Sequence, residues 1–158
     1  MEPTPPGLAV DIPGWGARTF THLLLDFTGT LSCDGVLLPG VAERLRQLAR
    51  SLQITVLTAD TFGTACRALA DLPVRVQLIT TGEDKARFLA QLTGCVVAIG
   101  NGVNDEAMLK ASALGIATIG PEGAAGRLLA VADVVVRDIV DALDLLLHPL
   151  RLKATLRV

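Results

Sequence analysis

Short apolar segments alternate along the chain with amphipathic segments, with a repeat of about 20 to 25 residues. Several of the apolar segments are apolar at almost every position, which is typical of parallel strands covered on both faces. In the amphipathic segments apolar residues recur every three or four positions, as they do on one side of a helix. The pattern predicts strands at Thr21–Phe27, Gln53–Thr58, Val74–Thr80, Cys95–Gly100, Leu114–Gly120 and Asp133–Val136, and helices at Val41–Leu52, Thr64–Ala70, Glu83–Leu92, Asp105–Ala111, Gly123–Ala130 and Ile139–Leu147.

This alternation predicts an α/β fold, a Rossmann-like three-layer sandwich with a mainly parallel sheet. Asp34 and Gly35 suit a tight turn, so residues 31–38 are predicted to form a small β-hairpin flap after the first strand. Residues 1–6 are Pro-rich and are predicted to be disordered. Residues 148–158 mix basic residues with leucines, and they could form an edge strand, a subunit contact or a frayed tail. Without a linker or a repeat, the 158 residues are predicted to form one domain.

Composition narrows the class of protein. The 14 Lys and Arg residues against 16 Asp and Glu give a net charge of −2, and 3% of the residues are aromatic, so nucleic acid is not an expected partner. No apolar run reaches the roughly 18 to 20 residues that cross a bilayer. The acidic, Pro-rich start differs from a secretory signal, and the three cysteines, which show no CxxC pairing, fit reduced thiols used as small core residues. We therefore expect a cytoplasmic protein with no membrane partner.

Two predicted strands end in polar residues, at the edge where α/β sheets bind ligands. Asp26 ends a leucine-rich strand, where a buried carboxylate is costly unless a metal ion or a phosphate site compensates its charge. Alternatively, Asp26 caps the turn through the amides of Thr28 and Thr30. Thr58 and Ala59, followed by an aspartate, end the next strand. A hydroxyl and backbone amides there can receive phosphate oxygens, although Thr and Asp also cap helices.

Two further polar segments open predicted helices. Lys85 adds a positive charge at a helix start, which already favours anions, although a lysine there is also common on a plain surface. Asn101, Asn104 and Asp105 stand among glycines that let a backbone approach a ligand. Their oxygens are ligands that Mg²⁺ prefers, but the same residues could form a simple turn before a helix.

The order and spacing of these segments resemble the haloacid dehalogenase superfamily from about residue 21 to residue 147. Thr58 follows Asp26 by 32 residues, Lys85 follows after 27 more and Asn101 after 16 more. The segment DFTGTL is similar to the phosphorylation loop of P-type ATPases, TAD to their TGD segment and GNGVND to their metal-binding hinge. More narrowly, the chain resembles the small soluble P-type ATPase-like phosphatases.

The resemblance implies a function and a set of roles. The chain is expected to be a Mg²⁺-dependent phosphatase that forms an aspartyl phosphate and hydrolyses phosphomonoesters. Asp26 is implied as the nucleophile, and the metal site is implied to include Asp26, the main-chain carbonyl of Thr28, Asn101 and Asp105. Lys85 is implied to offset the negative charge of the nucleophile and the phosphate, and the phosphoryl group is implied to contact Thr58, Ala59, Lys85 and Asn104.

Two positions depart from the pattern of the superfamily. Thr28 stands where phosphatase relatives carry an acid–base Asp, and such a group commonly contributes about 10² to 10⁴ in rate, so we expect slow hydrolysis. Asn101 replaces an Asp, which removes a negative charge from the expected metal site. The alternative is a weakly catalytic regulatory module that keeps the phosphate site and acts through a protein partner.

The intervals between the motifs exclude larger architectures. The 32 residues from Asp26 to Thr58 leave no room for the inserted domain of a pump, and neither this interval nor the next has room for a cap domain. The site is therefore expected to be open. It would admit a large phosphorylated substrate, or a second copy of the chain would cover it in a homo-oligomer.

Overall fold

The structure, a computed structural model, describes residues 2–158. Six parallel strands form the central sheet in the order β6, β5, β2, β7, β8, β9, and β1 pairs antiparallel with the first half of β2. The strands of this sheet are β1 (Leu8–Ile12), β2 (Gly16–Asp26), β5 (Gln53–Thr58), β6 (Arg75–Leu78), β7 (Cys95–Gly100), β8 (Leu114–Thr118) and β9 (Val134–Val136). The expected mainly parallel sheet is therefore confirmed.

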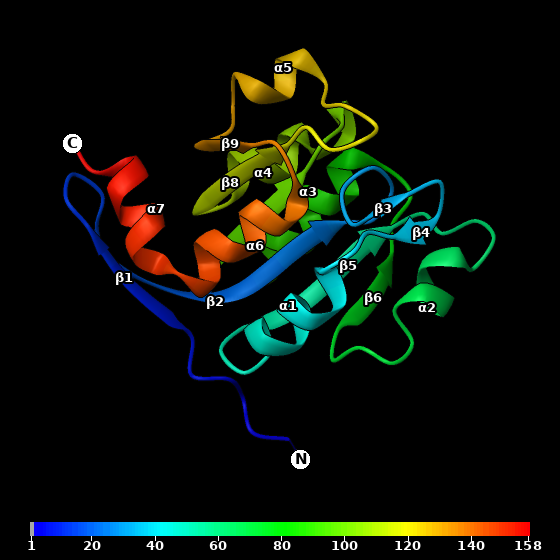
Figure 1. Ribbon diagram of the computed structural model, residues 1–158, viewed down its shortest axis with the longest axis horizontal. Helices are drawn as coiled ribbons and strands as arrows, with labels where there is room; N and C mark the ends of the chain where they lie inside the picture. The colour runs from blue at the N-terminus through cyan, green and yellow to red at the C-terminus, as the bar shows by residue number, and fades with distance from the viewer. Residues whose placement is uncertain (1) are drawn as a thin grey trace.

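Helices cover both faces of this sheet (Figure 1). One face carries α1 (Val41–Leu48) and α6 (Ile139–Leu147), and the other carries α3 (Gly82–Ala90) and α4 (Glu106–Ala111). The remaining helical elements are α2 (Thr64–Ala68), η1 (Val103–Asp105, a short 3₁₀ helix), α5 (Gly126–Leu129) and α7 (Pro149–Leu156). The three-layer sandwich is confirmed.

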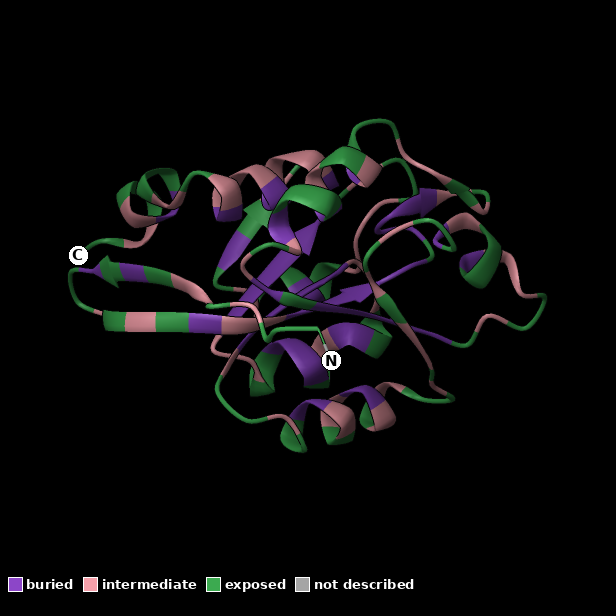
Figure 2. Ribbon diagram, turned by 90° about the horizontal axis from the view of Figure 1, so that it is seen from below, coloured by how far each residue is buried: buried purple, intermediate pink, exposed green. Residues whose placement is uncertain are grey.

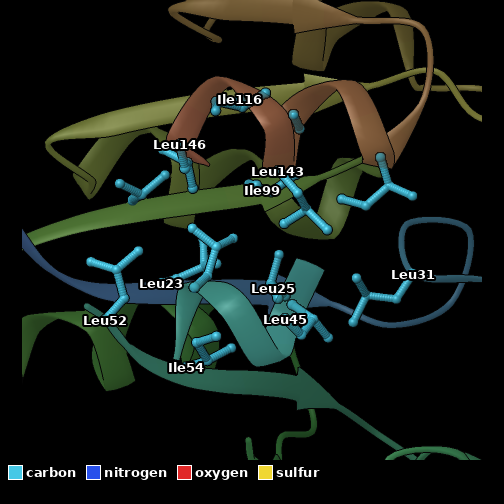
Figure 3. Packing of buried hydrophobic residues seen from close by; sticks show 14 of the residues in the cluster. Leu23, Leu25, Leu31, Leu45, Leu52, Ile54, Ile99, Ile116, Leu143 and Leu146 are labelled. Carbon is cyan, nitrogen blue, oxygen red and sulfur yellow. The ribbon is translucent and has the colours of Figure 1, made fainter. Parts of the chain in front are cut away.

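Successive side chains of β2 pack in two hydrophobic clusters, one on each face of the sheet. Leu23 and Leu25 pack with α1 and α6, where Figure 3 shows them beside Leu45 and Leu143. Leu24 points to the opposite face and packs in the cluster that contains residues of α3 and α4. Successive side chains of a strand point to opposite faces, so Asp26 shares the face of Leu24. Figure 2 shows the buried strands between helices whose outer surfaces are exposed.

The predicted strands and helices are present, most of them shorter by a few residues. The pattern missed β1 and the first half of β2, which form a hairpin whose strands alternate between buried and exposed residues and so contain no apolar run. It also left open the form of residues 148–158. Most of these residues form α7, which begins at Pro149, and Leu152 is completely buried against the core. Residues 2–6 have no regular secondary structure.

The expected flap is confirmed. Strands β3 (Ser32–Cys33) and β4 (Val36–Leu37) form the hairpin, and its turn holds Asp34 and Gly35 at φ values of 51° and 79°. The flap and α1 occupy the chain between β2 and β5, and α2 and β6 occupy the chain between β5 and α3. The cysteines carry no disulfide in the described part of the chain, but the prediction that all three are core residues is wrong, because Cys66 on the short helix α2 is exposed.

The strand order brings three strand ends together. After β2 the chain adds β5 and β6 on one side, then crosses to the other side of β2 to add β7, β8 and β9. A crevice forms where the strand order reverses in this way, at the carboxyl ends of the strands. Asp26, Thr58 and Asn101 stand at or just after the ends of β2, β5 and β7. Within residues 2–158, no helix has the length and apolar character needed to cross a membrane.

Candidate active site

The loop after β2 is wound tightly around one carbonyl group. The Phe27 carbonyl accepts the backbone amides of Thr30, Leu31 and Ser32 at 3.2, 3.0 and 3.1 Å, and it also accepts the Ser32 hydroxyl at 3.1 Å. Gly29 has a φ of 76°, and a Cβ there would lie 2.5 Å from the side-chain nitrogen of Asn101. Glycine at this position therefore permits both the turn and the close approach of the loop after β7.

Lys85 lies between two buried carboxylates. Its Nζ donates to Asp26 Oδ1 at 2.9 Å and to Asp105 Oδ1 at 2.7 Å. Thr81 starts α3 with a reciprocal capping box to Asp84, which places Lys85 on the same buried face as Leu89. Lys85 is 3% exposed, so the alternative of a plain surface lysine is excluded.

This buried cluster carries more negative than positive charge. When all three groups are ionised, Asp26, Asp105 and Lys85 sum to a charge of −1 away from water. Burial raises the pKa of Asp26 to about 6, the charge of Asp105 adds to this effect, and Lys85 opposes it. Burial acts to lower the pKa of Lys85, but the two carboxylates outweigh it and raise that pKa above its usual value. The arrangement therefore favours an additional cation beside Asp26.

Asp105 also closes the loop after β7. Its Oδ2 accepts the backbone amides of Asn101 and Gly102, each at 3.1 Å, and the side chain is completely buried. A Cβ at Gly100 would overlap the Asp105 carboxyl group, so this glycine lets the carboxylate reach the loop. Both oxygens of Asp105 are thus engaged, one by the loop and one by Lys85.

A threonine hydroxyl links Asp26 to Asn101. Thr30 Oγ1 lies 3.2 Å from Asp26 Oδ2 and 3.3 Å from Asn101 Oδ1. One hydroxyl proton can bond to only one of these acceptors at a time, so two oxygens converge on one point. Asn101 Nδ2 donates to the Gly123 carbonyl at 3.0 Å, which directs Oδ1 toward Thr30. The Thr30 amide donates to Phe27, so the expected alternative of a turn capped by this amide gives way to a contact through the hydroxyl.

The segment after β5 forms a helix cap beside the same crevice. Asp60 accepts the amides of Ala65 and Cys66 at 2.7 and 3.1 Å, while its own amide donates to Thr58 Oγ1 at 3.3 Å. Burial acts to raise the pKa of Asp60, but these hydrogen bonds and the charge of Arg67 hold it below its usual value. The helix-capping alternative is therefore correct for Asp60, because its carboxylate binds the amides at the start of α2.

The crevice is a cavity of about 560 Å³, and most of the site residues predicted from the sequence line it. Those that line it are Asp26, Thr28, Thr58, Ala59, Lys85, Asn101 and Asn104. Asp105 lies beneath this surface as the buried partner of Lys85. The part of the chain that the structure describes contains no group of three His, Cys, Asp or Glu residues placed to hold a metal ion, so any cation here would rely on amide and carbonyl oxygens as well.

Sequence reasoning missed several contributors. Thr30 lies within the DFTGTL segment, but spacing alone does not show that its hydroxyl faces two acceptors. Gly123 holds Asn101 from a loop 22 residues away, and Phe62 and Glu122 also line the cavity. Signals for these residues are weak, because loop glycines, exposed acids and lone aromatic residues occur on many surfaces.

The Lys85 ion pairs predict a large loss of stability for Lys85→Met at pH 8. Removing the cation leaves two buried carboxylates without a positive charge beside them, and breaking a buried pair in this way costs about 3 to 5 kcal/mol. Lys110→Met provides a matched control, because Lys110 bonds to Glu106 at 2.7 Å with 57% of its side chain exposed, and solvent screens that pair. Urea unfolding measures both changes. Equal losses for the two variants would show that the buried cluster does not depend on Lys85.

No protein-family model matches the chain. An uncharacterised protein of Methanocaldococcus jannaschii is 58% identical over 62 residues, a match that covers 39% of this chain and 67% of the archaeal protein. An identity this high over two thirds of the shorter protein places the two in one family.

Solved structures identify the fold. A 3-deoxy-D-manno-octulosonate 8-phosphate phosphatase from Moraxella catarrhalis, in complex with magnesium, phosphate and the sugar acid, superposes with a TM-score of 0.64 at 14% identity over 82% of this chain and 86% of that chain. A zinc-transporting PIB-type ATPase in its E2P state gives a TM-score of 0.64 at 23% identity over 75% of this chain. The chain has the fold of the haloacid dehalogenase superfamily.

Within this superfamily fold, the pumps match only in part. The chain spans about a fifth of the length of the zinc-transporting ATPase, 20%. The catalytic domain of the CPx-ATPase CopB-B is 27% identical over 70% of this chain and 46% of that chain, with a TM-score of 0.61. The phosphatase, by contrast, matches over most of both chains. The likeness to the pumps is therefore a likeness to one part of their chains.

Proposed function

We propose that the chain is a Mg²⁺-dependent phosphatase that acts through a phosphorylated Asp26. The observation that carries the proposal is the placement of the Asp26 carboxylate at the floor of the cavity, bonded to Lys85 and facing Asn101 across the Thr30 hydroxyl. The fold is shared with a phosphatase that binds magnesium and phosphate, and this supports the reaction class.

The donor set fits a hard cation. Asp26 Oδ2 and Asn101 Oδ1 converge on one hydroxyl, and Thr28 lines the same cavity. Oxygen donors of these kinds suit Mg²⁺, and the net negative charge of the buried cluster favours a cation. We assign Asp26, Asn101 and the Thr28 carbonyl as the residues that would hold it. Since both oxygens of Asp105 are engaged, Asp105 is better suited to position Lys85 and the loop than to be a ligand.

The chain's own residues account for the transfer step. Asp26 attacks the phosphorus, so that a bond forms from its carboxylate oxygen to phosphorus while the bond from phosphorus to the leaving oxygen breaks. The leaving oxygen keeps the electron pair and takes a proton from water. Lys85 offsets the negative charge of the carboxylate and of the phosphoryl oxygens. The Thr58 hydroxyl and the amides near Ala59 and Asn104 line the cavity and would donate hydrogen bonds to those oxygens. Bound Mg²⁺ supplies further positive charge to the phosphoryl group. Water then attacks the phosphorus of the aspartyl phosphate, which releases phosphate and restores Asp26.

Thr28 supports a second candidate function. This residue is exposed and lines the cavity, at the position from which an acid–base carboxylate would act in relatives. A hydroxyl group is a poor base near neutral pH, so a phosphoryl group on Asp26 would persist. Such a long-lived state suits a regulatory module that acts through a protein partner. Self-association remains a prediction that the open cavity motivates.

Capture of the phosphoryl group on Asp26 tests the proposal. After incubation with acetyl phosphate and Mg²⁺, an acid quench and peptide mapping by mass spectrometry should place one phosphoryl group on the peptide that contains Asp26. The same treatment with a chelator in place of Mg²⁺, or of the Asp26→Asn variant, should give an unmodified protein. Asp60→Asn, which changes a carboxylate of the same cavity, should still be labelled. Labelling at another residue, or none with Mg²⁺ present, would contradict the proposal.

A further inference from the structure

An aromatic residue stands at the edge of the cavity. Phe62 lines the same cavity as Asp26 and Lys85, yet it is 82% exposed. By contrast, Phe20 and Phe27 are buried in the core. A lone exposed aromatic residue is ordinary on a protein surface, but this one forms part of the wall of the candidate active site.

The turn that carries Phe62 is held in one conformation. Asp60 has a φ of 42° and Gly63 a φ of 69°, and the Gly63 amide donates to the Asp60 carbonyl at 3.0 Å. The Asp60 carboxylate caps α2 by accepting the amides of Ala65 and Cys66. Both sides of the turn are therefore fixed by hydrogen bonds, and the ring of Phe62 is presented from a rigid support. A backbone held in this way does not have to be ordered when a flat group packs on the ring.

The charges that line the cavity favour a substrate in which the group attached to the phosphate is uncharged. Asp26, Asp60 and Glu122 line it as acids, and Lys85 is its one cation in the described part of the chain. Lys85 is already bonded to two carboxylates. A substrate with a second anionic group would place that group among carboxylates without a free basic partner.

We infer that the site takes phosphomonoesters whose group next to the phosphate is flat, aromatic and uncharged, and that Phe62 stacks against this group. The inference rests on the proposed phosphatase function and names its substrate class. Aromatic rings gain from offset or edge-to-face packing beyond the area they bury. Phe62 is then a specificity residue, whereas the phosphoryl group is held by residues deeper in the cavity.

Binding of unreactive phosphonates tests the role of Phe62 apart from turnover. Phenylphosphonate should bind Phe62→Ala about three- to tenfold more weakly than wild type in the presence of Mg²⁺, while the affinity for methylphosphonate stays within about twofold. Phe62→Trp should keep the preference, and Val103→Ala, at an exposed apolar residue outside this cavity, should leave it unchanged. Isothermal calorimetry measures both ligands. Equal weakening of the two phosphonates by Phe62→Ala would overturn the inference.

A pair of substrates that match in shape but differ in charge tests the electrostatic part. 4-Carbamoylphenyl phosphate should exceed 4-carboxyphenyl phosphate in kcat/KM by about two- to fivefold, and Glu122→Gln should narrow the difference. A preference for the carboxylated substrate would overturn the inference.

Labelling of Asp26 by acetyl phosphate shows whether a negative result concerns the substrate class or the phosphatase function. If Asp26 is labelled but Phe62→Ala affects both phosphonates alike, only the substrate class is wrong. If Asp26 is never labelled, the phosphatase function itself fails.

Discussion

Asp26→Asn is expected to lower phosphatase turnover by at least about a thousandfold and, at pH 8, to raise the free energy of unfolding. The first effect follows because removal of a covalent nucleophile typically costs several orders of magnitude in rate. Turnover of 4-nitrophenyl phosphate with Mg²⁺ measures it. Asp60→Asn, whose carboxylate caps α2, should keep most of the activity. Equal turnover by Asp26→Asn and wild type would exclude Asp26 as the nucleophile.

The size of the stability gain from Asp26→Asn depends on pH. The pKa of Asp26 is about 6 in the folded protein and near 3.8 when the group is exposed, so the folded state holds the proton more tightly than the unfolded chain. The wild-type protein is most stable with respect to this group below about pH 4, where the buried carboxyl group is neutral. It loses this stability as the pH rises through 6 and the buried group becomes charged. Because two pKa units correspond to about 3 kcal/mol, Asp26→Asn should gain up to about that amount at pH 8.

Urea unfolding in the presence of a chelator, at pH 4 and at pH 8, measures this gain. The two proteins should be close in stability at pH 4, where Asp26 is neutral in the folded protein and only about half ionised in the unfolded chain. Asp60 supplies the opposite case, because its pKa is lowered in the fold and its charge stabilises above the unfolded pKa. Asp60→Asn should therefore lose stability at pH 8. A gain for Asp26→Asn that does not change with pH would contradict the buried-charge explanation.

Thr28→Asp is expected to accelerate hydrolysis of the phosphoenzyme by about a hundredfold. Thr28 stands two residues after Asp26 and faces the cavity, so a carboxylate there could take a proton from the attacking water. General bases of this kind contribute about 10² to 10⁴ in rate. Because Thr28 is exposed, the substitution places its charge in water and should leave the fold intact.

Decay of phosphate from labelled Asp26, followed after removal of acetyl phosphate, measures the Thr28 effect. Thr28→Asn has the same shape as Thr28→Asp but no base, so it should decay as slowly as wild type. Thr61→Asp adds a carboxylate elsewhere on the cavity wall and should also decay slowly. If Thr28→Asp decays no faster than these controls, the slow step does not depend on the group at position 28.

The alternation of apolar and amphipathic segments was enough to predict the layers of the fold. Parallel strands buried on both faces must be apolar throughout, so β5 and β7 were predicted with the bounds that the structure gives. The β1–β2 hairpin lacked this signal, because one side of it faces water. The segment that became α7 was ambiguous for a different reason. Its burial depends on a partner surface, and Leu152 packs into a core made by distant residues.

The sequence by itself determined which residues stand at the strand ends, since Asp26, Thr58 and Asn101 each follow a run that could only be a buried strand. Tertiary structure decided what those residues contact. The order of strands around β2 brings Asn101 close to Asp26, 75 residues earlier in the chain, and the buried face of α3 places Lys85 between two acids. Hydrogen bonds such as those of Thr30 depend on distances of a few tenths of an ångström, which linear spacing does not encode.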